Sequence, residues 1–267
     1  MRFVLPFERL RHIARSVDDD RTLAAEAADC LAAFDDDPAG IVVACRRLLD
    51  HQPASPLMWW LCARVLTASD PSDAAWEAEG LVRNDHTPDR LAGVLPFPPE
   101  RPIAVLGWPE LTAEALASRP DLEVLVVRGL RDGDWSRRLA RSTASARPVP
   151  IAEAAACDPS HVLVEIVAAS ETQVLVAAGT RSVLDDLTSA DTMVWLVAGV
   201  GRVLPARLFD AMTTKMTTKV GDLDAVGLEH FDPQLADRIA GPHGLERPEH
   251  LARLVDAPVA PELLRGV

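Results

Sequence analysis

The chain has 267 residues, of which 48% are hydrophobic and 25% are charged, and its net charge is −13. This length allows two domains or one large one, and the composition is that of a globular protein. The negative charge argues against nucleic acid or an anionic membrane as the main partner, because both select a basic surface. Residues 1–7 lack the apolar core of a signal peptide, and the sequence has no run of ~20 apolar residues, so we predict a cytoplasmic protein.

Residues 7–94 show the patterns of several short helices. The alanine-rich stretch 21–34 contains neither glycine nor proline, which favours helix. Asp and Pro residues at 35–38 supply a cap and a first-turn proline for the next helix. We therefore predict a helical N-terminal domain over 1–94. Four prolines within 95–102 then predict a stiff linker.

Beyond residue 102, short apolar runs alternate with helical patterns. The runs that we expect to be strands are 102–107, 122–129, 161–166 and 193–199, with 148–151 as a short edge strand. The expected helices are 110–118, 135–142, 152–157, 181–187 and 205–212. Uninterrupted apolar strands indicate a parallel sheet with helices on both faces. The predicted fold class is therefore α/β, with a Rossmann-like doubly wound domain over 103–267 and an irregular tail from 243.

In open parallel sheets, ligands bind beyond the carboxyl ends of the strands, so candidate residues are sought there. Arg128, with Gly129 behind it, ends the second predicted strand and could hold a phosphate or carboxylate. An ion pair with Asp132 or Asp134 at the surface explains it equally well. Glu165 lies inside an apolar run, and a buried carboxylate needs a partner or a proton. It is either an acid/base group or the partner of an arginine such as Arg128 or Arg202.

Two glycine-containing turns are the other candidates. Gly179 and Thr180 precede a predicted helix, where free backbone N–H groups could hold an anion, although capping of the helix alone explains the sequence. Gly199, Gly201 and Arg202 follow a late strand as a tight turn or as a phosphate cradle. The candidate ligand-binding set is thus Arg128, Gly129, Gly179, Thr180, Gly199, Gly201 and Arg202.

Other chemistry is not indicated by the sequence. The four cysteines form no CxxC pair and the seven histidines have no ligand spacing, so we predict neither a metal site nor a cofactor. No Ser-His-Asp or Cys-His arrangement can be proposed. The threonine-rich segment 213–219 is expected to be a loop or an edge strand. Trp59, Trp60 and Trp76 are either core residues or anchors for a protein partner.

The order of these features resembles a known family. The run 161–166, the pair Gly179-Thr180, the run 194–197 and the segment 231–233 are similar to motifs of the alpha, beta and delta subunits of translation initiation factor 2B. The same motifs occur in methylthioribose-1-phosphate isomerase and ribose-1,5-bisphosphate isomerase. The resemblance implies a homodimer through the α/β domain, and it makes Arg128 similar to the family arginine that meets the substrate phosphate.

The sequence departs from the isomerase pattern at its catalytic positions. The family cysteine aligns with Pro109, the aspartate with Val167, and the Asn-Lys pair with Val176-Ala177. These side chains cannot move protons, and Glu165 is the nearby carboxylate that could substitute. We therefore expect a catalytically degenerate protein, a pseudoenzyme, that binds a small sugar phosphate or nucleotide, a protein partner, or both. The alternatives are a divergent isomerase using Glu165 and Arg128, and a structural interaction module.

Overall fold

The computed structural model describes residues 19–34, 37–96, 100–128, 139, 142, 145–218 and 220–265. The chain divides into two compact units. The helical unit comprises residues 1–85, 200–226 and 255–267, and the sheet unit comprises residues 86–199 and 227–254. Each unit is described by itself below. The helix expected over 135–142 lies outside the described residues except for positions 139 and 142.

Within described residues 19–85, the helical unit contains four helices whose starts follow from their sequences. They are α2 (Asp20–Leu31), α3 (Pro38–His51), α4 (Pro56–Thr67) and α5 (Pro71–Arg83). Each is preceded by an Asp or Ser whose side chain accepts a hydrogen bond from a backbone N–H of the first turn. In α3, α4 and α5 a proline follows that cap, at a position where the missing N–H costs nothing. The helices expected from the patterns at 21–34 and after 35–38 are confirmed as α2 and α3.

Helix α4 is the centre of the helical unit. It contacts α2, α3, α5 and α11 (Ala206–Thr217), and the side chains of Trp59 and Trp60 are fully buried. The indole N–H of Trp60 donates to Asp256 Oδ1 at 2.6 Å, which attaches the C-terminal segment to α4. That segment ends in a short 3-10 helix, η4 (Pro261–Leu263).

Helix α11 extends further than the sequence suggested. The expectation of a loop or edge strand at 213–219 is wrong over 213–217, where α11 continues. The hydroxyl groups of Thr213 and Thr217 donate to the carbonyls of Asp210 and Thr213, both at 2.9 Å, so these side chains bond within the helix. Burial of Met212 and Met216 on one side of the helix outweighs the weak helix propensity of threonine.

The sheet unit contains a seven-stranded sheet in the order β10-β9-β7-β4-β1-β2-β3. Its strands are β1 (Ile103–Leu106), β2 (Val124–Val127), β3 (Ala146–Val149), β4 (His161–Glu165), β7 (Met193–Val197), β9 (Arg238–Gly241) and β10 (Gly244–Glu246). All neighbours are parallel except β9 and β10. The predicted α/β fold class, with a doubly wound parallel sheet, is confirmed. The tail expected to be irregular from 243 contains β10 and η3 (Pro248–Leu254).

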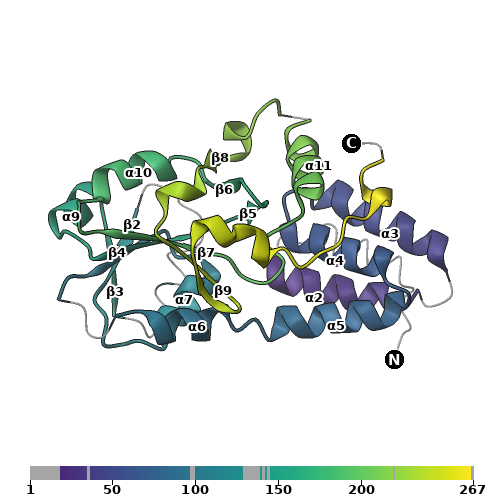
Figure 1. The fold of residues 1–267 in the computed structure, drawn as a ribbon, viewed down its shortest axis with the longest axis horizontal. Coiled ribbons are helices and arrows are strands. Elements are labelled where there is room, and N and C mark those ends of the chain that lie inside the picture. Colours follow the sequence, from purple (N-terminus) through teal and green to yellow (C-terminus); the bar gives the residue numbers. More distant parts are fainter. Residues whose placement is uncertain are drawn as a thin grey trace. The chain divides into compact units, whose positions relative to one another are not determined.

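Helices cover both faces of this sheet, as Figure 1 shows. Helices α6 (Thr87–Val94) and α7 (Glu110–Ala117) pack against each other on one face, and α9 (Ile151–Ala156) and α10 (Thr180–Leu187) do so on the other. Alternate residues of β1 and β2 form a core with α6 and α7 in which Trp108 is 2% exposed. Burial on both faces explains why these strands read as continuous apolar runs.

A second, antiparallel sheet of three strands completes the unit. Its order is β5 (Ala168–Ala169), β6 (Val174–Ala177) and β8 (Leu228–Phe231). Strand β8 follows the short η1 (Asp224–Val226) and precedes η2 (Pro233–Leu235). This sheet was not expected from the sequence.

The compact units first divide the chain between residues 85 and 86. Helix α6 belongs to the sheet unit because Leu91 and Leu95 lie in the core with α7. Residues 200–226 and 255–267 belong to the helical unit because α11 and η4 contact α4 and α3. Contacts between distant segments, rather than the proline-rich stretch, determine where the units divide.

Candidate functional site

The carboxyl ends of the parallel strands form the edge at which a ligand site is expected. Strands β1 and β2 pair in register there, so Gly107 and Arg128 follow neighbouring strand ends. Gly107 has a φ of +70°, and a Cβ at this position would meet open space. Arg128 donates its backbone N–H to the carbonyl of Val149, and its side chain is exposed. Gly129, Asp132 and Asp134 lie outside the described residues.

Glu165, the candidate acid/base group, caps a helix. Its Oε2 atom accepts hydrogen bonds from the backbone N–H of Thr112 at 3.0 Å and from the hydroxyl of Thr112 at 3.1 Å. Thr112 lies in the first turn of α7, whose N-cap residue Pro109 provides no side-chain cap. Glu165 lies on the same strand face as Leu163, which packs against α7. The partly buried carboxylate therefore meets the N-terminal partial charge of α7 as well as two donors.

A second carboxylate occupies the start of α10. Glu229, on β8, accepts from the N–H of Gly179 at 2.9 Å through Oε2 and from the N–H of Arg181 at 2.8 Å through Oε1. Gly179 has a φ of +88°, a left-handed conformation that glycine adopts without a steric penalty. The hydroxyl of Thr180 donates to the carbonyl of Ala177 at 2.7 Å. The backbone N–H groups that the sequence suggested for an anion are thus bonded to the chain's own carboxylate.

The turn after β7 belongs to the packing of the helical unit from Val200 onward. Gly201 has a φ of +70°, and an added Cβ would lie 2.8 Å from Leu57 and 3.0 Å from Trp60. Arg202 forms an ion pair with Asp20 at 3.0 Å. Gly199 is buried at the end of the sheet unit. Close packing against Leu57 and Trp60 accounts for a glycine at position 201. The ion pair with Asp20 accounts for an arginine at position 202.

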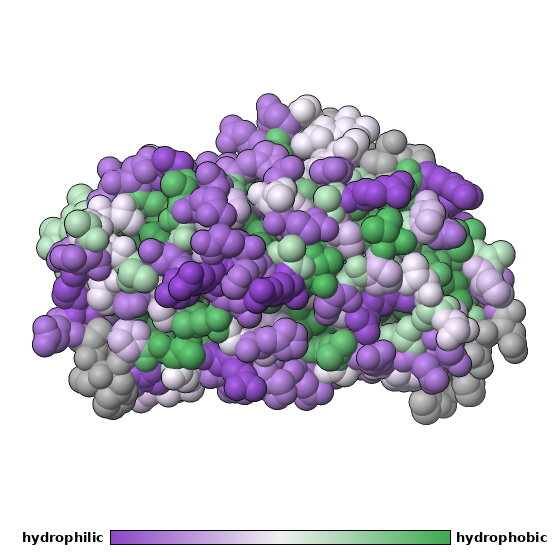
Figure 2. Space-filling model, viewed as in Figure 1, coloured by the Kyte–Doolittle hydropathy of each residue, from purple (hydrophilic) through white to green (hydrophobic). Residues whose placement is uncertain are grey.

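The three tryptophans that were considered as anchors for a partner differ in their exposure. Trp59 and Trp60 are core residues, whereas Trp76 on α5 is 50% exposed. Among the residues that the structure describes, the other exposed large hydrophobic side chains are Val43, Leu81, Val94, Val220 and Leu235. Figure 2 shows hydrophobic residues scattered among hydrophilic ones on the face that it presents. Trp76 is accordingly the one tryptophan of these three that is placed to meet a partner.

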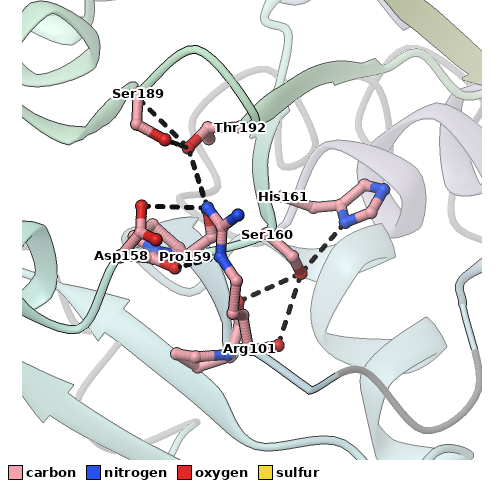
Figure 3. Close-up of polar contacts among 8 residues, drawn as sticks. Arg101, Asp158, Pro159, Ser160, His161, Ser189 and Thr192 are labelled. Carbon is pink, nitrogen blue, oxygen red and sulfur yellow. Dashed lines mark hydrogen bonds and ion pairs between the residues drawn. The ribbon is translucent and has the colours of Figure 1, made fainter.

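The opposite edge of the sheet carries a polar cluster that the sequence did not reveal (Figure 3). Arg101 donates to the carbonyl and the carboxylate of Asp158, at 2.7 and 2.9 Å, and to the hydroxyl of Thr192 at 3.4 Å. Ser160 lies within hydrogen-bonding distance, 3.1 Å, of His161 Nδ1. The cluster links the starts of β1, β4 and β7 and lies at the edge away from the expected ligand site.

His161 is the titratable group of this cluster with a perturbed pKa. Burial lowers its pKa below the usual 6.5, the charge of Asp237 opposes that shift, and the charge of Arg101 adds to it. The ring meets the indole of Trp195 edge to face, with centroids 4.9 Å apart. Desolvation beside an aromatic ring keeps the imidazole neutral at physiological pH.

The described residues hold no cluster of three or more His, Cys, Asp or Glu side chains suited to a metal ion. Cys30, Cys45 and Cys62 are buried, and burial raises the pKa of the Cys62 thiol well above its usual value. No helix in the described part of the chain is both long and apolar enough to cross a membrane.

Comparison with solved structures identifies the architecture. The translation initiation factor eIF-2B of Pyrococcus horikoshii OT3 matches with a TM-score of 0.68 at 13% identity, covering 91% of this chain and 97% of that one. The chain has the fold of an eIF2B subunit. The tetrameric eIF2B-beta2-delta2 complex from C. thermophilum gives a TM-score of 0.65 at 12% identity, with 93% and 92% covered.

An enzyme shares this fold as well. The 5-methylthioribose 1-phosphate isomerase of Pyrococcus horikoshii OT3 matches with a TM-score of 0.63 at 13% identity, covering 93% of this chain and 86% of that one. No protein-family model matches the sequence, and no curated protein sequence matches it. The resemblance expected from the sequence is confirmed at the level of the fold.

Proposed function

We propose that this chain is a catalytically inactive protein with the eIF2B-subunit fold, which acts through a protein partner in a regulatory role. The observation that supports it most is the pair of hydrogen bonds from Thr112 to Glu165 Oε2. A general base must reach the proton that it removes, whereas this oxygen is engaged by a helix of its own chain. In this proposal Glu165 is a structural cap.

The positions that the resemblance assigns to isomerase chemistry support the same conclusion. Pro109 is the N-cap of α7, Val167 donates its N–H to the carbonyl of Leu175, and Val176 is buried in β6. None of these side chains has an ionisable group, and opening a cyclic sugar phosphate requires groups that move protons. The fold is therefore retained in this proposal without the reaction.

Turnover measurements on wild type and Glu165→Gln test the absence of catalysis. With 5-methylthioribose 1-phosphate and ribose 1,5-bisphosphate as substrates, we expect no isomerisation by either protein. The glutamine keeps an oxygen that can accept from Thr112, so the variant should fold, which thermal unfolding checks. Wild-type turnover that falls by about 10²-fold or more in Glu165→Gln would show a general base and overturn the proposal.

The first partner that we propose is a second copy of this chain, bound through the sheet unit. A similar structure belongs to a tetrameric complex, which supports assembly as the use of this fold. Sedimentation velocity at micromolar concentration should give twice the chain mass of 28.8 kDa. Sedimentation as a monomer would remove self-association from the proposal and direct the search to another protein, with Trp76 as the first residue to replace.

A second candidate function is binding of a small phosphorylated ligand at the strand edge. The exposed Arg128 side chain beside Gly107, around which space is open, favours it. A panel of sugar phosphates and nucleotides should then raise the unfolding temperature of wild type but not of Arg128→Ala. An identical shift in both proteins would exclude Arg128 as the phosphate ligand.

A further inference from the structure

The helical unit contains a pocket of about 190 Å³ that gathers positive charge. Three cationic side chains line it, those of Arg46, Lys215 and Arg265, against one carboxylate, that of Asp50. The whole chain has a net charge of −13 and only 27 Lys and Arg residues against 40 Asp and Glu residues. The lining of this pocket therefore carries an excess of two positive charges, opposite in sign to the net charge of the whole chain.

Contacts within the pocket determine which charges face a ligand. Lys215 Nζ lies 2.6 Å from Asp50 Oδ1, so this pair is largely neutralised. Arg46 donates Nε and Nη2 to the carbonyl of Glu262 at 3.1 and 2.9 Å, which fixes its guanidinium plane and leaves Nη1 outside these bonds. Arg265 lines the pocket from the segment after η4, and the described residues give its guanidinium no hydrogen bond or ion pair.

The rest of the lining is apolar and fixed. Leu49, Trp59 and Leu263 are buried, and the indole N–H of Trp59 is already donated to the carbonyl of Pro53 at 3.0 Å. Arg46, Leu49 and Asp50 lie on one face of α3 because residues three and four positions apart are neighbours on a helix. The exposed side chains of Arg46 and Arg265 thus lie beside an apolar wall.

We propose that this pocket binds a phosphate group, as free phosphate or as a small phosphate ester. Two arginines that a carboxylate does not neutralise suit a dianion, and the guanidinium fork matches phosphate oxygens. The volume is below the roughly 300 Å³ at which sites for drug-sized ligands begin, so the occupant is smaller than a nucleotide. The site is distinct from the strand edge, because every residue that lines it belongs to the helical unit.

Calorimetric titration of the full chain with inorganic phosphate, at constant ionic strength, tests the site. Arg265→Gln should weaken phosphate binding by about tenfold, the usual effect of one charge-assisted hydrogen bond. Asp50→Asn should strengthen binding, because it removes the pocket's negative charge. Arg207→Gln is the matched control, since it removes an exposed arginine of the same unit outside the pocket and should leave binding unchanged.

The outcomes separate the sources of the ligand and the competing site. Tighter binding of glycerol 3-phosphate than of phosphate, lost in Arg265→Gln, supports the site with an ester as occupant, and binding of phosphate alone supports it with the free ion. The absence of phosphate binding in wild type overturns the proposal. So does binding that Arg128→Ala abolishes and Arg265→Gln leaves intact. Unfolding curves measured without phosphate show that each variant is folded.

Discussion

The two units of this protein differ in the charged groups that they place at potential anion sites. In the sheet unit, the N-termini of α7 and α10 are bonded to the carboxylates of Glu165 and Glu229. In the helical unit, Arg46 and Arg265 line a pocket whose single carboxylate, that of Asp50, is paired with Lys215. The fold directs attention to the strand edge, yet the helix N-termini of the sheet unit are bonded to carboxylates, whereas the helical unit presents cations in a pocket.

The difference shows that architecture and chemistry are separate properties of this chain. The N-terminus of a helix attracts any anion, so a neighbouring carboxylate side chain can occupy it in place of a bound ligand. Once Glu165 and Glu229 provide it, the same geometry that binds phosphate elsewhere becomes a means of holding strand to helix. The variants below test whether the sheet unit differs from the helical unit because side-chain carboxylates, rather than a ligand, occupy its helix N-termini.

The largest effect is expected from Gly201→Ala, which tests whether the turn after β7 serves packing. The alanine would have to adopt a positive φ and bring its Cβ within 2.8 Å of Leu57. Strain and overpacking together should lower the free energy of unfolding by about 3 kcal/mol, measured by urea denaturation. Gly80→Ala in α5 is the control, because its Cβ would meet nothing within 4 Å and alanine favours helix. Equal stability of Gly201→Ala and wild type would contradict the packing role.

Glu229→Ala addresses the comparison directly, because it removes the carboxylate that caps α10. Loss of the bonds to Gly179 and Arg181 should cost about 1–2 kcal/mol of unfolding free energy, as for other helix caps. It should also make the stability of the variant sensitive to phosphate through the vacated N–H groups. Glu249→Ala, at an exposed position of η3, is the control. A variant as stable as wild type would show that the cap contributes nothing.

A smaller effect is expected at the other carboxylate. Thr112→Val removes the hydroxyl that donates to Glu165 Oε2 and keeps the backbone N–H in place. One lost hydrogen bond at a partly buried carboxylate should lower the unfolding free energy by about 1 kcal/mol, measured in urea. Thr112→Ser keeps the hydroxyl and should retain the contribution of that hydrogen bond. If serine and valine destabilise the protein equally, the bond is not what the threonine provides.

The smallest effect concerns pH. Because burial lowers the pKa of His161 in the folded chain below 6.5, protonation favours the unfolded state. The stability contribution of neutral His161 is complete above pH 6.5 and is lost progressively as the pH falls below that value. Unfolding curves between pH 7.5 and 5 should therefore show a weaker dependence on pH for His161→Gln than for wild type. An NMR titration midpoint for His161 at or above 6.5 would refute this account.

Much of the framework could be predicted from the sequence because it depends on local signals. Caps such as Asp37 and apolar runs such as 103–106 specify helices and strands over a few residues. The antiparallel strand β8 was missed since its four residues, Leu228–Phe231, include two polar ones and only Phe231 is buried. With β8 missing, Glu229 could not be found, although it lies 50 residues beyond Gly179 in sequence and 2.9 Å from it in space.

The charged pocket shows a related limit. Arg46 and Asp50 give a local signal, being one helical turn apart, but Lys215 and Arg265 join them only through tertiary packing. Arg46 meets the carbonyl of Glu262 across 216 residues of sequence. Such a site depends on how distant segments pack together. The sequence therefore shows the individual charged residues but not that they lie side by side.

The division of the chain has a consequence for its synthesis. The polypeptide passes from one unit to the other at 85/86, 199/200, 226/227 and 254/255. The fully buried Trp60 of α4 donates its indole N–H to Asp256. This contact of α4 can form only after a segment nearly 200 residues further along the chain has been synthesised. The helical unit, although it holds the first residues synthesised, is therefore complete only after residues 255–267 have been made. A chain that ended before Asp256 would leave the indole N–H of Trp60 without this acceptor.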